Sequence, residues 1–122
     1  MSALPPYALM LGIRVGEDAV LVMPFSPHLI GSPGRLHGGA VAGLLELAAN
    51  LAVRDALAEK SVVLKPVTVT VDYLREGAMV DTFARAHINR LGRRVANVRV
   101  EAWQTDAGKP IAAAQLNIIL ER

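Results

Sequence analysis

The chain has 122 residues, which is enough for one domain with one hydrophobic core and too short for two. Hydrophobic residues make up 52% of it and aromatic residues only 4%, so the composition excludes disorder and predicts a core of Val, Leu, Ile and Ala. A net charge of +2 does not by itself indicate nucleic-acid binding, and the lack of cysteine excludes disulfide frameworks, thiolate metal sites and cysteine nucleophiles.

The first half of the sequence predicts a hairpin, a loop and a long helix. Residues 6–25 alternate apolar and polar side chains around the turn "GED", as the two strands of a hairpin would. Residues 26–39 hold four glycines and two prolines and are predicted to form a loop. A helix rich in Ala and Leu is expected from about Gly38 to Ala58.

The second half predicts four strands joined by short turns. One long helix with an antiparallel sheet belongs to the α+β class, and a helix lined by Gly and Ala suits a strongly curved sheet wrapped around it. No linker or repeat divides the chain, so residues 1–122 are predicted to be a single domain. The expected strands are residues 62–74, 80–91, 95–105 and 111–121. In the first strand, one face should carry Val67, Val69, Val71 and Tyr73, and the other face Thr68, Thr70 and Asp72.

Neither a membrane span nor a secretion signal is expected. The apolar run from Leu36 to Val53 is about the minimum spanning length, but Glu46 at its centre, Asn50 and three glycines argue against a span. The first residues, "MSALPPYALML", have no basic region and are broken by two prolines. We therefore expect a soluble, cytoplasmic protein.

Glu46 is a carboxylate in the middle of the apolar helix, and burying it without a partner would cost several kcal/mol or force it to protonate. Asn50 and Arg54 follow at four and eight residues, so the three side chains share one stripe of the helix. Two interpretations stay open. The stripe either reaches solvent with the carboxylate hydrogen-bonded to Asn50, or holds the carboxylate in a cleft for catalysis.

The turn "HGG" runs directly into the helix start. Its glycines are expected to leave the N–H groups of Gly38 and Gly39 uncovered at the positive end of the helix dipole, where they could stabilise an oxyanion. Glu46 lies about 12 Å along the same helix at about 1.5 Å per residue, too far for one substrate carbonyl to contact both. An antiparallel helix from a second subunit would close that distance, which predicts a symmetric homodimer with two shared sites.

The stretch "GRLHGGAVAGLLELAANLA" resembles the signature of the PaaI-like acyl-CoA thioesterases, which have the hotdog fold. In that family an HGG turn opens the central helix and an acidic residue follows nine positions after the histidine, as Glu46 follows His37 here. The hairpin "GRRVANVRVEA" is also typical of the family, and the resemblance extends over residues 12–121.

The resemblance implies a role for each matching residue. Glu46 would attack the thioester or activate a water molecule, the Gly38 and Gly39 amides would hold the oxyanion, and His37 would orient the turn. The substrate would be an acyl-CoA, no cofactor or metal would be needed, and dimers could pair into tetramers. The residues expected to contact substrate are Ser32, Asn50, Thr68, Arg90, Arg93 and Arg94. The three arginines would bind the nucleotide phosphates of coenzyme A. The alternative is that they belong to an ordinary solvated turn.

The sequence departs from the family pattern at two points. The loop before HGG has no asparagine, so Ser32 or His28 would have to replace it. Where many members carry Ser or Thr after the helix, this chain has Pro66, with Thr68 expected on the same face. Alternatives are a non-catalytic acyl-CoA-binding protein, a hotdog dehydratase and a dimerisation domain. The acyl pocket is expected against the helix wall formed by Val41, Leu44 and Leu45.

Overall fold

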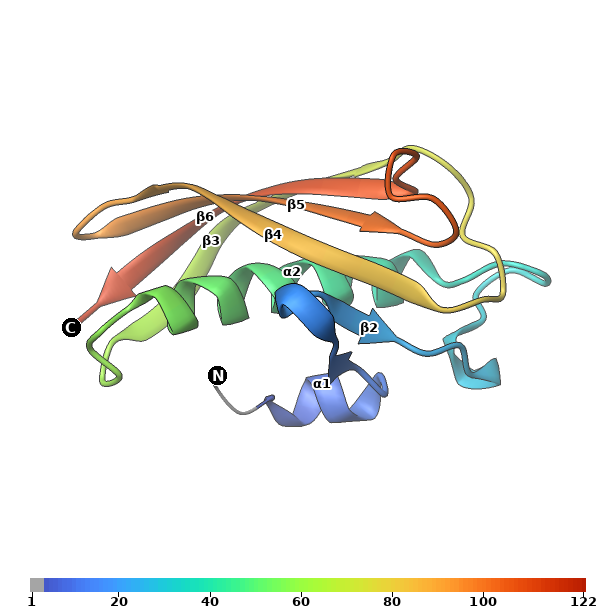
Figure 1. Cartoon of the computed structure of the whole chain (residues 1–122), viewed down its shortest axis with the longest axis horizontal. Helices are drawn as coiled ribbons and strands as arrows, with labels where there is room; N and C mark the ends of the chain where they lie inside the picture. The colour runs from blue at the N-terminus through green and yellow to red at the C-terminus, as the bar shows by residue number, and fades with distance from the viewer. Residues whose placement is uncertain (1–3) are drawn as a thin grey trace.

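A computed structural model describes residues 4–122 and contains a six-stranded antiparallel sheet with one long helix (Figure 1). The strands lie in the order β1-β2-β4-β5-β6-β3, so the third strand in sequence forms one edge of the sheet. The elements are α1 (Pro6–Met10), β1 (Arg14–Val15), the 3₁₀ turn η1 (Glu17–Ala19), β2 (Leu21–Met23), the 3₁₀ turn η2 (Pro27–Leu29), α2 (Gly38–Ala56), β3 (Val63–Tyr73), β4 (Thr82–Leu91), β5 (Val95–Trp103) and β6 (Ala112–Glu121).

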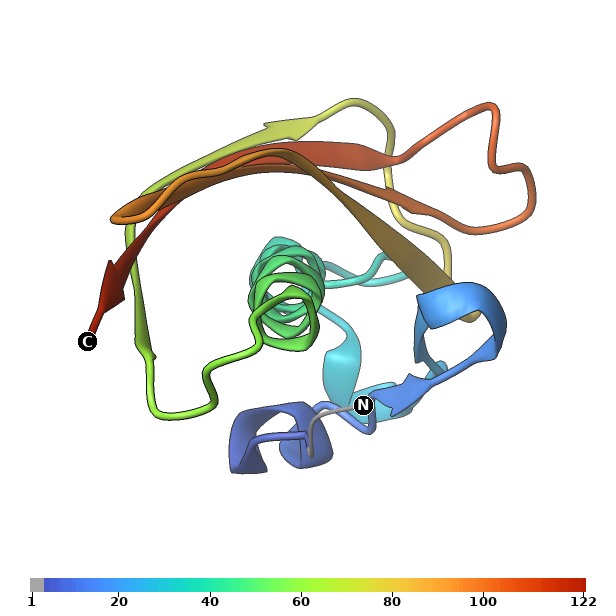
Figure 2. The ribbon, with the colours of Figure 1, turned by 60° about the vertical axis from the view of Figure 1, so that its left-hand side comes forward.

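The sheet arches over α2, which lies in its concave side (Figure 2). Leu44 and Leu45 of α2 are fully buried against inward-facing residues of the strands such as Val98 and Leu116. Strands β5 and β6 alternate buried residues with more exposed ones, because successive side chains point to opposite faces of a sheet. The predicted α+β architecture, a curved antiparallel sheet around one helix, is confirmed. The helix ends at Ala56, two residues before the expected Ala58.

The prediction that residues 6–25 form one hairpin is correct only for the central part of this segment, where β1 pairs with β2. The segment that begins it folds as the short helix α1, and the hairpin is reduced to the pairing of β1 with β2. Pro6 starts α1 because a proline ring is compatible with the first turn of a helix. Helix α1 then packs on α2 at Gly43, where an added Cβ would lie 3.0 Å from the ring of Tyr7. The close contact therefore depends on the small residues of α2.

Strand β3 is an 11-residue edge strand whose free side exposes apolar residues. The exposed side chains include Val63, Val67, Val69 and Tyr73. The strand tolerates Pro66 because an edge strand need not donate every N–H to a neighbour. Long apolar edges favour pairing with another chain.

A β-bulge between Pro66 and Thr68 overturns one expectation about β3. Pro66 pairs with Ile118, which is buried toward α2, whereas Thr68 pairs with Asn117 on the outer face. The extra residue reverses which side chains face inward. Thr68 therefore does not share a face with Pro66 and points away from α2.

Within residues 4–122, no helix is long and apolar enough to cross a membrane. Helix α2 has 19 residues, but polar side chains interrupt its apolar surface.

Candidate active site

The loop before α2 is held in place by backbone hydrogen bonds. Leu36 donates its N–H to the Gly77 carbonyl at 3.0 Å, and His37 donates to the Leu29 carbonyl at 2.8 Å. Gly31 lies so close that an added Cβ would be 2.9 Å from the His37 Cα atom. These contacts fix where the HGG turn enters the helix.

The two glycine amides of the turn are not equivalent. His37 caps α2, and its Nδ1 atom accepts the N–H of Gly39 at 2.8 Å. The expectation that both amides are uncovered is therefore wrong for Gly39, because a side-chain acceptor at the N-cap satisfies an otherwise unpaired helical N–H. Among the described residues no group accepts the N–H of Gly38. The turn thus presents one free amide donor at the positive end of α2.

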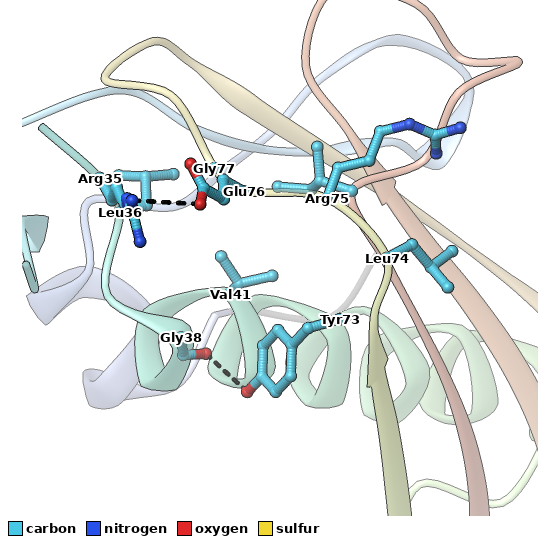
Figure 3. A pocket seen from close by; sticks show the side chains of 10 residues that line it. Arg35, Leu36, Gly38, Val41, Tyr73, Leu74, Arg75, Glu76 and Gly77 are labelled. Carbon is cyan, nitrogen blue, oxygen red and sulfur yellow. Dashed lines mark hydrogen bonds and ion pairs between the residues drawn. The ribbon is translucent and has the colours of Figure 1, made fainter.

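Tyr73, at the end of β3, contacts the same turn. Its hydroxyl donates a hydrogen bond to the Gly38 carbonyl at 3.0 Å (Figure 3). Its ring lies 3.4 Å from where a Cβ on Gly38 would be. The sequence placed Tyr73 on a strand face but gave no signal for this contact, which joins residues 35 positions apart.

A cavity of about 350 Å³ opens beside Gly38. It is walled by Val41 of α2 and by Tyr73, and the ion pair between Arg35 and Glu76 lies at its edge with a distance of 3.2 Å (Figure 3). Both side chains of the pair are more than half exposed, so the pair contributes little stability by itself. The cavity leaves room for a ligand beside Gly38.

Glu46 is half-buried on α2, and its carboxylate makes no hydrogen bond or ion pair with residues 4–122. The hydrogen bond to Asn50 expected under one interpretation is therefore not formed. The Oδ1 atom of Asn50 is buried and has no partner among the described residues. Arg54 instead donates to the Lys60 carbonyl at 3.3 Å. The stripe thus holds a carboxylate and an amide oxygen that both lack a partner within residues 4–122.

The β4–β5 hairpin carries an exposed group of arginines. Arg90, Arg93 and Arg94 line a surface cavity of about 420 Å³, together with Asn97 and Asn117. None of the three guanidinium groups pairs with a carboxylate in the part of the chain that the structure describes. An unpaired cluster of this kind can bind phosphate groups.

Comparison with known proteins identifies the family. The sequence model described as the acyl-CoA thioesterase N-terminal domain matches residues 27–118, which is most of the chain. The chain belongs to this thioesterase family. It is accordingly a thioester hydrolase, and the predicted resemblance to PaaI-like hotdog thioesterases is confirmed in family and fold. None of the curated proteins compared with it matches.

Solved structures from several bacteria share the fold of the thioesterase. A Chromobacterium violaceum protein is 33% identical, with a TM-score of 0.79 over 96% of this chain and 84% of its own. A phenylacetic acid degradation-related protein from Ralstonia eutropha is 23% identical, with a TM-score of 0.83 over 97% and 92%. A Bacillus halodurans protein solved with CoA is 20% identical, with a TM-score of 0.84 over 97% and 80%.

Of the three residues expected to form the apolar wall of the acyl pocket, Val41 borders the cavity beside Gly38. Leu44 and Leu45 are fully buried under the sheet, because their side of α2 faces the strands. A cavity of about 500 Å³ lies instead beside Asn50, on the side of α2 that faces the start of β3. Its apolar lining includes Leu47, Leu51, Val62 and Leu64.

The loop residues considered as replacements for the family's asparagine differ in position. Ser32 is exposed, and its carbonyl accepts the Arg35 N–H in a turn. His28 shares a cavity of about 290 Å³ with His37 and Gly39, and its Nδ1 atom lies 2.7 Å from the Ser26 hydroxyl. His28 therefore borders the same cavity as the HGG turn. Residues 4–122 contain no cluster of His, Asp or Glu that could hold a metal ion.

Proposed function

We propose that the thioesterase hydrolyses an acyl-CoA, with Glu46 as the catalytic carboxylate and the Gly38 N–H as the oxyanion donor. The observation that carries this proposal is the unequal use of the two glycine amides. Gly39 donates its N–H to His37, whereas the N–H of Gly38, at the start of α2, has no acceptor in the part of the chain that the structure describes. Glu46 follows on the same helix with a carboxylate that has no partner among the described residues.

In the reaction, the thioester carbonyl would accept the Gly38 N–H. As a general base, Glu46 would take a proton from water while the water oxygen bonds to the carbonyl carbon. The negative charge would develop on the carbonyl oxygen, where the amide and the helix dipole stabilise it. The C–S bond would then break, and the CoA sulfur would take the proton. In the nucleophilic route, a Glu46 carboxylate oxygen would instead bond to the acyl carbon as the C–S bond breaks and CoA leaves as its thiolate, which takes a proton from water. Water would then open the resulting anhydride, which frees the acid and restores the carboxylate.

The proposal requires two subunits, because Gly38 and Glu46 of one chain are about 12 Å apart at about 1.5 Å per helical residue. Strand β3 provides the surface for this homodimer. It is an edge strand with exposed Val67 and Val69, and Tyr73 at its end contacts Gly38. Antiparallel pairing of two β3 strands would bring the end of one, with its HGG turn, to the start of the other. Further pairing of dimers into tetramers stays a prediction.

The nucleotide part of coenzyme A would lie on the hairpin arginines. Arg90, Arg93 and Arg94 offer three exposed cations without carboxylate partners in the described residues. The Bacillus halodurans structure with CoA supports a CoA ester as substrate. The acyl group would enter the cavity beside Asn50. That no cofactor is needed and that the protein is cytoplasmic remain predictions.

The test is hydrolysis of a panel of aryl, short-chain and long-chain acyl-CoAs by the wild-type protein and by Glu46→Gln and Glu46→Ala. Both variants should lose about 10²- to 10⁴-fold in kcat, the usual contribution of a general base. Glu17→Gln, which changes an exposed acid on η1, should match the wild type. Full activity in both Glu46 variants would disprove the assigned role.

A second measurement separates catalysis from binding. Isothermal titration with a non-hydrolysable thioether analogue should show binding by the wild type and by Glu46→Gln. Tight binding without turnover of any panel member would favour a non-catalytic acyl-CoA-binding protein. Single-turnover hydrolysis in ¹⁸O water distinguishes the two routes, because only the nucleophilic route transfers solvent oxygen first to the carboxylate.

A further inference from the structure

We infer that Tyr73 is a positioning residue that sets the orientation of the Gly38 amide donor from the end of β3. The inference rests on the proposed role of Gly38 as the oxyanion donor. Tyr73 would not touch the reacting atoms. It acts through the hydrogen bond from its hydroxyl to the Gly38 carbonyl, at 3.0 Å.

The hydrogen bonds of the HGG turn explain why one hydroxyl matters. The Gly38 N–H belongs to the same planar peptide group as the His37 carbonyl, which accepts the N–H groups of Ala40 and Val41 at 3.0 and 3.3 Å. The next peptide group is held at both ends, with its carbonyl bonded to Tyr73 and its N–H to His37. Glycine has no side chain and is the residue with the most conformational freedom. Without these hydrogen bonds, the peptide groups on either side of Gly38 could therefore rotate against each other.

Tyr73 is itself fixed to the sheet. It pairs with Ala112 in the register of β3 and β6. The two residues that follow it, Leu74 and Arg75, both donate their N–H groups to the Ile111 carbonyl, at 2.8 and 3.0 Å. The hydroxyl is therefore carried by a backbone that is paired with β6 or with the residue before it at three successive positions, although 57% of the Tyr73 surface is exposed. A rigid strand thus supports the first turn of α2 from outside the helix.

The ring of Tyr73 also covers one side of Gly38. A Cβ at that glycine would lie 3.4 Å from three atoms of the ring, including the hydroxyl oxygen. The ring and Val41 form walls of the cavity next to the amide (Figure 3). The Tyr73 ring therefore limits access to one side of Gly38.

The test compares Tyr73→Phe with wild type on the best acyl-CoA of the panel. Loss of the hydroxyl should lower kcat about 10-fold and change KM less than about twofold, since misplacing a catalytic group can cost about 10²-fold and the ring remains in place. The matched control is Thr70→Val, which removes a hydroxyl from the outward face of the same strand and should behave as wild type. Midpoints of thermal unfolding are measured for both variants.

A second readout separates positioning from a merely structural contact. The proteins are labelled with ¹⁵N-glycine. Adding the thioether analogue should shift the Gly38 amide resonance in wild type, and this shift should be smaller in Tyr73→Phe. The amide resonances of the other glycines should be the same in both proteins. An unchanged kcat in Tyr73→Phe, or a loss explained by a lower unfolding midpoint with an unchanged Gly38 shift, would overturn the inference. Wild-type protein that hydrolyses no acyl-CoA would instead refute the proposed function.

Discussion

The Nδ1 atom of His37 lies 2.8 Å from the Gly39 nitrogen and accepts a hydrogen bond from its N–H, while the N–H of Gly38, one residue earlier, has no acceptor within residues 4–122. The two glycines of the turn therefore have separate tasks. Gly39 completes the N-cap that starts α2, and Gly38 leaves a donor free in the field of a 19-residue helix. Each task can be removed without the other.

Gly38→Pro should remove the donor and keep the helix. Proline has no N–H, and it is favoured at the first position of a helix. His37 already has φ −68° and ψ 130°, which suits a residue before proline. We expect kcat to fall about 10²- to 10³-fold, the usual cost of losing one oxyanion donor. Gly38→Ala is the matched control because it keeps the N–H. If the Gly38 N–H is the oxyanion donor, Gly38→Ala must be more active than Gly38→Pro in the same assay.

Substitutions of His37 should separate the cap from catalysis. His37→Ala leaves the Gly39 N–H without its side-chain acceptor and should lower the free energy of unfolding by about 1 kcal/mol, as for other N-caps. His37→Asn offers a new capping oxygen and should recover most of that loss. Urea titration followed by circular dichroism measures both. Equal destabilisation by Ala and Asn would show that the imidazole contributes more than capping.

The separation of Gly38 and Glu46 could be predicted from the sequence, because both lie on one regular helix whose geometry is known. The outward position of Thr68 could not, since a single bulged residue reverses the faces of β3. The helix α1 was missed because alternation in a short segment does not exclude a helix that begins at a proline. The contact of Tyr73 with Gly38 depends on tertiary packing across 35 residues, which no local pattern reveals.

Charging the free edge of β3 should disrupt the dimer. Val69 is 41% exposed on this edge strand, and a lysine there would oppose a like charge near the two-fold axis of the proposed pairing. Val69→Lys should elute as a monomer in size-exclusion chromatography with light scattering and lose activity with it. Val80→Lys adds the same charge at a site that is 42% exposed outside β3 and should remain a dimer. An active Val69→Lys monomer would contradict the shared site.

Removing the hairpin arginines should weaken binding of the nucleotide and leave chemistry intact. Arg93→Ala combined with Arg94→Ala should raise KM for acyl-CoA about 10-fold, since two exposed ion pairs at up to about 1 kcal/mol each add up to about the 1.4 kcal/mol that a tenfold change requires. The same variant should hydrolyse an acyl-pantetheine, which lacks the nucleotide, at the wild-type rate. Arg99→Ala on the outer face of β5 is the control. An equal effect on both substrates would place the arginines outside nucleotide binding.

Mixing two inactive variants gives the sharpest test of a site built from two chains. Glu46→Gln and Gly38→Pro each damage every site of their own homodimers. In a mixed dimer with shared sites, one site carries both changes and the other carries neither. Random pairing of equal amounts makes half of the dimers mixed, so about a quarter of wild-type activity should return. The variants are unfolded and refolded together, with each variant refolded alone as control. If each chain held a complete site, the mixture would show no more activity than the two variants separately, because every chain would still lack either its acid or its donor.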